Sequence, residues 1–373
     1  MKKIISILLT LALLCSCALL SSCSSSSSDS LKESLTGNYD VEELKGTVLN
    51  VFNWGEYMSL GADGELDVNK AFEEVTGIKV NYTTYESNEQ MYSKMKSGAV
   101  SYDIVIPSDY MIERMIKENM LQKLDMSKIT NYGNIDEQYK NLYFDKNNEY
   151  SVPYNVGLVG LIYNKAMTGT DIDSWTAMWD EKYKDNILTF NNPRDAFMIA
   201  QIVLGQDLNS TDPMDWYKAA EKLKEQNPLL QGRVMDEIFN KMESANAAIA
   251  PYYAGDFLLM KENNDDLEFV YPKEGTNIFV DSVCVPTSAQ NYDAAMLYIN
   301  FLLETEIALA NAESICYASP NTTVVNNDNY TYKGNKILYP DKKDMPKCEY
   351  YHDLNEKIRT YYETLWEEVL NTK

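Results

Sequence analysis

Between residues 47 and 120 the chain alternates short apolar stretches with longer amphipathic ones, and this order constrains the fold more than any other feature. Apolar stretches that stop at turn residues predict strands, and apolar residues spaced three or four apart predict helices. The predicted strands are 47–52, 78–82 and 102–108, and the predicted helices are 69–77, 88–98 and 109–120. Because each strand is followed by a helix, the connections favour a parallel sheet covered by helices, and we expect an α/β fold.

The same alternation resumes after the apolar segment 150–164 and continues toward the C-terminus. A chain of 373 residues is long enough for two domains of ordinary size. We expect two lobes, each a sheet flanked by helices, which are connected near 151–156 and 276–282 and enclose a cleft. The predicted boundaries are 46–153 plus 280–320 for lobe 1 and 154–279 plus 321–373 for lobe 2.

Two of the predicted strands end in clusters that combine aromatic and acidic residues. "NWGEY" follows the first strand and brings Trp54, Glu56 and Tyr57, and "PSDY" follows the third strand. Ligands of open α/β sheets bind outside the carboxyl ends of the strands, so both clusters should face one crevice. Flat apolar faces beside a negative charge suit a ligand that carries a positive charge on an apolar body.

The charge and the rarer residues exclude several other functions. The net charge is −23 and the body holds no run of Lys and Arg, so we expect no nucleic-acid partner. His352 is the only histidine, and the sequence has no nucleophile-elbow, GxGxxG or P-loop motif. Cys284, Cys316 and Cys348 fit no metal-binding spacing and allow at most one disulfide.

The N-terminus has the pattern of a targeting segment. "MKK" is a positive region, and the apolar stretch that follows leads into Leu20-Ser21-Ser22-Cys23. These four residues resemble the lipobox of bacterial lipoproteins, which implies a signal peptide over 1–22 and a lipid on Cys23. Residues 23–45 begin with a run of serines, and we expect a flexible tether there. The alternatives are a second, weaker match at 14–17, a plain secretory signal or a transmembrane helix.

Longer motifs resemble one known family over residues 48–353. They are "NWGEY", "TGIKVNYTTYESNEQMYSKMKSG", "YDIVIPSDYMIERMIKENMLQKLD", "YSVPYNVGLVGLIYN", "VYPKEGTNIFVDSVCVP" and "LYINFLL". They look like the bacterial spermidine/putrescine-binding proteins, the receptors of polyamine ABC importers. The resemblance implies a two-lobed periplasmic-binding-protein fold of type II. It also implies a monomer outside the cytoplasm that works with a permease and its ATPase, is no enzyme and needs no cofactor or metal.

The resemblance also implies which residues bind the ligand. In the second half of the chain the family motifs correspond to "NNPRD", "YAGD", "IFVDS" and "YASPN". Tyr351 is a weaker candidate, because the match is loose there. The implied ligand-binding residues are Trp54, Glu56, Tyr57, Ser108, Tyr110, Asn192, Asp195, Tyr253, Asp256, Phe279, Asp281 and Tyr317.

These residue types suit the chemistry of a polyamine. An ammonium group needs a carboxylate or carbonyl oxygen, because burying it unpaired is very costly. The methylene groups need apolar walls, and an aromatic face both contacts them and attracts a cation. A sugar site would need more neutral hydrogen-bonding groups, and an amino-acid site would need an arginine. Arg194 is the only arginine near these motifs, and the resemblance points it away from the ligand.

The chain departs from the family pattern at several positions. Asn192 is neutral where spermidine-preferring members carry an acid, whereas Asp256 is an acid found in putrescine-preferring members. Tyr253 and Phe279 are smaller than the usual tryptophans, and Gly55 lacks the hydroxyl that relatives often place there. We therefore expect a preference for putrescine or a mixed specificity. A different organic cation, a role as a polyamine sensor and a hydrolase on the same surface are the alternatives.

Overall fold

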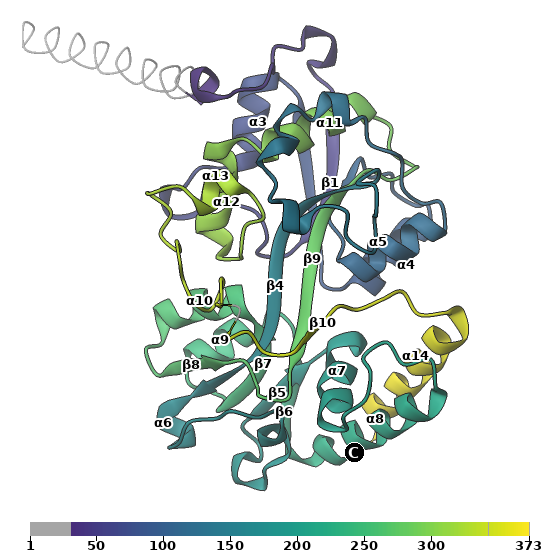
Figure 1. Cartoon of the computed structure of the whole chain (residues 1–373), viewed down its shortest axis with the longest axis vertical. Coiled ribbons are helices and arrows are strands. Elements are labelled where there is room, and N and C mark those ends of the chain that lie inside the picture. The colour runs from purple at the N-terminus through teal and green to yellow at the C-terminus, as the bar shows by residue number, and fades with distance from the viewer. Residues whose placement is uncertain (1–30, 342, 373) are drawn as a thin grey trace, which may run out of the picture.

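In the computed structural model, the residues that can be described are 31–341 and 343–372, and they form two lobes (Figure 1). Two long strands, β4 (Ser151–Asn164) and β9 (Thr276–Cys284), run side by side from one lobe to the other. They pair in antiparallel register from Ser151 opposite Cys284 to Leu158 opposite Ile278. These strands are the two connections that the sequence predicts. The predicted signal peptide and Cys23 lie outside the described residues.

The described strands form one sheet of ten strands that continues through both lobes. The order is β2-β1-β3-β9-β4-β7-β5-β6, with β10 added on β9 and β8 on β4. β1 is parallel to β2 and β3, and β5 is parallel to β6 and β7, as the alternation of strands and helices predicts. The remaining bounds are β1 Val48–Trp54, β2 Lys79–Tyr85, β3 Ile104–Val105, β5 Ile187–Phe190, β6 Leu230–Val234, β7 Ile249–Tyr253, β8 Leu267–Val270 and β10 Cys348–Glu349.

Helices flank the sheet in both lobes (Figure 1). Those of lobe 1 are α3 Val68–Thr76, α4 Asn88–Lys96, α5 Asp109–Lys117, α11 Tyr292–Leu302, α12 Thr305–Ile315 and α13 Thr322–Val325. Those of lobe 2 are α6 Lys165–Thr168, α7 Pro193–Val203, α8 Pro213–Gln226, α9 Ile238–Glu243, α10 Ala254–Asn263 and α14 Glu356–Asn371. Short 3₁₀ helices occupy Glu42–Leu44, Ala62–Gly64, Met126–Lys128, Thr130–Asn134, Glu137–Tyr139, Trp175–Trp179, Glu181–Tyr183 and Asn227–Leu229.

Local signals set the ends of several helices. Asp67 caps α3 by accepting from the backbone N–H of Lys70, and Gly77 ends it in the left-handed conformation. Asp212 caps α8, and Pro213 occupies its first turn. The apolar pattern of 291–314 predicts a single helix, but Glu304 takes an extended conformation and divides this segment into α11 and α12.

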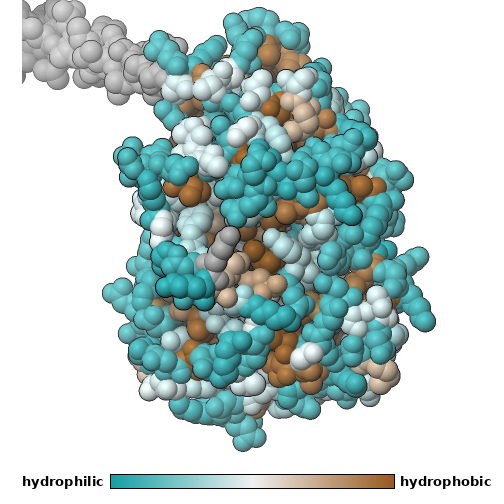
Figure 2. Space-filling model, in the orientation of Figure 1, coloured by the Kyte–Doolittle hydropathy of each residue, from teal (hydrophilic) through white to brown (hydrophobic). Residues whose placement is uncertain are grey.

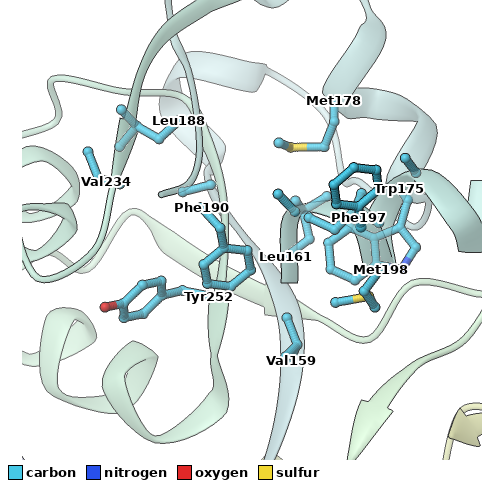
Figure 3. Close-up of a cluster of buried hydrophobic side chains, with 14 of the residues drawn as sticks. Val159, Leu161, Trp175, Met178, Leu188, Phe190, Phe197, Met198, Val234 and Tyr252 are labelled. Carbon is cyan, nitrogen blue, oxygen red and sulfur yellow. The ribbon is translucent and has the colours of Figure 1, made fainter. Parts of the chain in front are cut away.

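Each lobe has its own core. In lobe 2, the side chains of Trp175, Met178, Phe197 and Met198 gather beside Phe190 and Tyr252 (Figure 3). The buried indole of Trp175 donates to the carbonyl of Gly275 at 2.8 Å, so its one polar atom is satisfied. In α14 the predicted apolar face, formed by Ile358, Tyr362, Leu365 and Val369, is buried in this core.

Packing differs from the predicted lobe boundaries in one segment. The prediction places 321–373 in lobe 2, and α14 does pack against α8 there. Val324 and Tyr330, however, pack against Ala308 and Ala312 of α12 in lobe 1. The chain therefore reaches lobe 2 only after this stretch.

The segment just before β1 is attached to lobe 1 by a cluster of hydrogen bonds to Glu304, together with a hydrogen bond from Ser34 to Glu306. Oε2 of Glu304 accepts from the N–H of Thr36 at 3.0 Å, and Oε1 accepts from the N–H of Gly37 at 2.7 Å and from Oη of Tyr39 at 2.8 Å. Tyr39 is only 3% exposed and belongs to the lobe 1 core. We call these contacts the Glu304 clamp. Ordered contacts therefore begin inside the segment 23–45, where the sequence predicts a tether.

Replacing Glu304 with alanine is expected to lower the free energy of unfolding by about 2–3 kcal/mol, because the clamp consists of hydrogen bonds to a charged group. Burial alone would raise the pKa of Glu304, but the hydrogen bonds from Thr36, Tyr39 and Gly37 outweigh it and lower the pKa. This contribution is therefore present above the pKa of the unfolded chain and is lost on acidification. Urea unfolding measures it, with the exposed Glu43→Ala as control, and equal loss in both variants would contradict it.

Candidate ligand-binding site

The lobes enclose a cavity of about 800 Å³, including the open solvent at its mouth. Every ligand-binding residue that the sequence predicts lines this cavity, and so does Tyr351. The lining residues come from the turn after β1, the first turns of α5, α7 and α10, strand β9 and the segment after α12. The predicted residues brought together are Trp54, Glu56, Tyr57, Ser108, Tyr110, Asn192, Asp195, Tyr253, Asp256, Phe279, Asp281 and Tyr317.

Helix starts hold two of the carboxylates in place. Asp195 and Asp256 lie in the first turns of α7 and α10, where the helix dipole favours a negative charge. Asn192 caps α7 by accepting from the N–H of Asp195 at 2.9 Å, and its amide donates to Oδ2 of Asp195 at 2.9 Å. The side chain of Asn192 therefore serves the helix and its neighbouring acid.

Tyrosine hydroxyls orient the acids of the cavity. Each pair joins a phenol to a carboxylate oxygen, and most join segments that lie far apart in the sequence. The donors and acceptors are Tyr57 to Asp281 at 2.6 Å, Tyr253 to Asp195 at 2.6 Å, Tyr351 to Asp195 at 2.9 Å, Tyr317 to Asp256 at 2.9 Å, Tyr110 to Glu89 at 2.9 Å and Tyr252 to Asp236 at 3.3 Å. Oδ1 of Asp281 is buried and has no hydrogen-bond partner. The carboxylates are thus held in place with acceptor capacity left for a ligand.

Burial raises the pKa values of several acids of the cavity. The pKa of Asp256 is raised to about 8 by burial, with the nearby charges of Asp236 and Glu56 adding to the effect and the hydrogen bond from Tyr317 opposing it. Burial raises the pKa of Asp281 to about 6, and the nearby hydroxyls of Ser108 and Tyr57 act against this increase. The pKa of Glu89 is likewise raised by burial. Carboxylates in such an environment are stabilised by a cation.

Aromatic rings form the walls between the acids. The indole of Trp54 is fixed by a hydrogen bond from Nε1 to the carbonyl of Ile106 at 2.9 Å. The rings of Tyr57 and Tyr317 meet edge to face, with centroids 5.0 Å apart, and those of Tyr253 and Phe279 meet edge to face at 5.5 Å. The cavity therefore offers apolar faces between charged ends.

Arg194 is the single basic residue among the lining residues, against seven acidic ones. Its guanidinium lies 4.5 Å from the ring centroid of Tyr351 and 5.4 Å from that of Trp216. Nη2 donates to Oδ1 of Asn209 at 3.0 Å. Arg194 is thus held in lobe 2 by these rings and by Asn209, whereas its Nε and Nη1 are buried and have no hydrogen-bond partner.

The sequence prediction missed several lining residues, among them Tyr85, Glu89, Asp236 and Tyr252. Glu89 belongs to the "TYESNE" motif, whose two glutamates could have indicated a second acid. Asp236 follows β6, a strand that the apolar pattern does not predict because its residues are mostly half-exposed. Glu56, expected as an ammonium partner, is exposed at the rim of the cavity, with a left-handed φ of 43°.

Contacts between the lobes show that the cleft is closed. The rings of Tyr110 in lobe 1 and Tyr351 in lobe 2 meet edge to face with centroids 5.8 Å apart. Nζ of Lys117 lies 3.1 Å from Oδ2 of Asp353, and the N–H of Asp353 donates to Glu113 at 2.8 Å. The cavity is therefore covered by side chains of both lobes.

Two lobes joined by paired strands, with one acidic and aromatic cavity between them, define an α/β solute-binding protein. The chain belongs to the family of bacterial extracellular solute-binding proteins, which it matches over residues 68–337. The predicted fold class is thereby confirmed.

Individual relatives cover most of the chain. The spermidine/putrescine-binding periplasmic protein of Salmonella typhimurium is 36% identical over 319 residues, which are 84% of this chain and 89% of the relative. The structure of a proposed spermidine/putrescine ABC transporter of Listeria monocytogenes has a TM-score of 0.83 at 36% identity and covers 88% of this chain and 100% of that one. The structure of the spermidine/putrescine ABC transporter substrate-binding protein PotD of Streptococcus pneumoniae has a TM-score of 0.71 at 35% identity. It covers 87% of this chain and 99% of that one.

Other features of the described chain concern metals and membranes. Within residues 31–341 and 343–372, no group of His, Cys, Asp and Glu side chains is placed to hold a metal ion. Cys284, Cys316 and Cys348 are free thiols. In the same ranges, no helix has the length and hydrophobicity to cross a membrane. Hydrophilic residues cover most of the face seen in Figure 2.

Proposed function

We propose that the protein is a receptor outside the cytoplasm that binds putrescine or spermidine between its lobes and delivers it to an ABC importer. It acts as a binding protein and not as an enzyme. The observation that carries the proposal is the composition of the cavity lining. Seven acids and several aromatic faces line it, and the one basic residue, Arg194, donates to Asn209. The relatives named above support the same ligand class.

The geometry accounts for a diamine or triamine. Each ammonium placed against a carboxylate gains about 1.5–3 kcal/mol per charge-assisted hydrogen bond, and contact with an aromatic face adds about 0.5–2 kcal/mol. Oδ1 of Asp281, which is buried without a partner, is an acceptor for one ammonium. The rings of Tyr57, Tyr253 and Phe279 contact the methylene groups, and hinge motion along β4 and β9 opens the cavity for exchange.

The side chains favour putrescine or a mixed specificity. Asn192 contributes no charge, and its amide hydrogen-bonds to Asp195. Asp256 contributes a negative charge, and its carboxylate accepts a hydrogen bond from Tyr317. Compared with the family pattern, one carboxylate is lost and another is gained. This change alters the length of polyamine for which every ammonium has a carboxylate partner.

The proposal includes the attachment of the protein to its transport system. A lipid on Cys23 anchors the chain to the outer face of a membrane, and the closed monomer docks on a permease driven by a cytoplasmic ATPase. The alternatives are a receptor for another small organic cation and a sensor that presents the bound amine to a signalling protein. Loss of polyamine uptake when the permease is deleted supports import over sensing.

Calorimetric titration of the purified protein with putrescine and spermidine tests the proposal. We expect saturable binding of at least one amine, and stabilisation against heat of about 2.7 kcal/mol at an amine concentration one hundred times the dissociation constant. Glutamate and a neutral sugar are the controls and should give no binding. If neither amine gives binding heat or a shift in thermal unfolding, the proposal is contradicted.

A further inference from the structure

Gly55, in the turn after β1, lies against a carboxylate that comes from the other lobe. A methyl group built on Gly55 would lie 2.7 Å from Oδ2 of Asp236, which is too close for any real Cβ atom. Gly55 is not one of the glycines with a left-handed φ, and the left-handed residue of this turn is Glu56. A larger residue at Gly55 would therefore have to displace the Asp236 carboxylate, whereas the backbone conformation of the turn does not require glycine there.

Asp236 lies in the loop between β6 and α9 and lines the cavity at its mouth. Tyr252 donates to its Oδ1 at 3.3 Å, and no Lys or Arg of residues 31–341 or 343–372 forms an ion pair with it. Asp236 is exposed to solvent on one side, and desolvation by the protein atoms around it, followed by the charge of Glu237, raises its pKa against the hydrogen bond from Tyr252. An acid held at the mouth of an acidic cavity without a counter-cation is placed for a cation that arrives with the ligand.

Asp236 comes close in the structure to the neutral Asn192. Nδ2 of Asn192 donates to Oδ2 of Asp195 at 2.9 Å and lies 3.7 Å from Sδ of Met235, the residue before Asp236. A linear diamine carries one ammonium at each end, and each ammonium needs a carboxylate. Asn192 brings no charge, and Asp236 brings one to the same part of the cavity lining.

We propose that Asp236 is a specificity-determining residue, which binds the second ammonium of the ligand and supplies the counter-charge that Asn192 lacks. Gly55 is the residue that makes this position available when the lobes close. This inference rests on the proposed polyamine function. It adds that selection for a second charge depends on a loop of lobe 2 meeting the "NWGEY" turn of lobe 1.

Asp236→Asn tests the proposal because it removes the charge and keeps the size of the side chain. We expect about a tenfold loss of affinity for putrescine, from the loss of one charge-assisted contact, with little change for butylamine, which has one ammonium. Trp54 lines the cavity, so its fluorescence reports binding of both amines. Glu237→Gln is the matched control, since it removes the same charge from the adjacent residue, which does not line the cavity.

Gly55→Ser places a side chain where the Asp236 carboxylate lies. We expect it to weaken putrescine binding by a similar factor, and the double variant G55S/D236N to be no weaker than G55S alone, because both changes remove one contact. This variant leaves every acid in place, so it keeps the test open if Asp236→Asn folds poorly. Thermal unfolding without ligand checks the fold of all variants.

The outcomes separate the two proposals. If the unchanged protein binds neither amine, the proposed function fails. If it binds putrescine but Asp236→Asn loses less than threefold, or loses no more than Glu237→Gln, the role of Asp236 is overturned. An equal loss for putrescine and butylamine also overturns it, because Asp236 would then not select for the second charge.

Discussion

Alanine in place of Asp281 is expected to weaken polyamine binding by at least about thirtyfold, because truncating one member of a buried charge pair costs about 2–5 kcal/mol. Asp281 lies in β9, accepts from Tyr57 at 2.6 Å and keeps Oδ1 without a partner. Removing the carboxylate would leave an ammonium without its counter-charge inside the closed cavity, and this loss should appear mainly as faster release.

Calorimetry with putrescine and spermidine measures this effect. Asp293→Ala is the control, since Asp293 is an exposed acid of lobe 1 that pairs with Lys128 on the surface. Tyr57→Phe separates the charge from its orientation, because it keeps the carboxylate and removes only the phenol donor. Asp281→Ala binding as tightly as Asp293→Ala would refute the assignment of Asp281 to the ligand.

Affinity for putrescine is expected to rise by at least about a hundredfold between pH 5 and pH 8. In the ligand-free protein the pKa is about 8 for Asp256 and about 6 for Asp281, so both acids hold protons at pH 5. An ammonium needs the ionised carboxylates, and binding therefore releases these protons. Primary amines keep their own protons until about pH 10, so the amine does not limit binding in this range.

Titrations in phosphate and in Tris at pH 7 report the protons released, because the two buffers differ in ionisation heat. Asp256→Asn is the matched variant, and it should lose most of the pH dependence above about pH 6, where Asp281 is already ionised. The stability of the ligand-free protein should show the opposite pH dependence and decrease as pH rises. Since the folded-state pKa values of these acids are raised, their contribution to stability is greatest at low pH and falls as pH rises from about 4 to 8. Equal affinity at pH 5 and pH 8 would rule this account out.

The sequence predicts best those parts of the fold that depend on neighbouring residues. The start of α3 at Asp67 and its end at Gly77 follow from a cap and a glycine, and the apolar face of α14 follows from its spacing. The division between α11 and α12 could not be predicted, because Glu304 is held by partners 265–268 positions away in the chain. β6 was missed because its exposed side chains give no apolar alternation.

The site shows the same limit. Family motifs were sufficient to bring the predicted residues to one cavity, since motifs fix which strand end each residue occupies. They could not reveal that tyrosines satisfy the acids, because Tyr57 and Asp281 are 224 positions apart. Nor could they indicate that Gly55 lies against the carboxylate of Asp236, which belongs to the opposite lobe.

The Glu304 clamp has a mechanical consequence. A force from the N-terminal residues enters lobe 1 beside α11 and α12, through Leu31 and Leu35 at the core, the hydrogen bond from Ser34 to Glu306 and the Glu304 clamp, and not at the paired strands β4 and β9. Lobe 2 therefore does not bear that force. A receptor anchored through its N-terminal segment can then open and close its cavity without moving lobe 2 against the force on that segment.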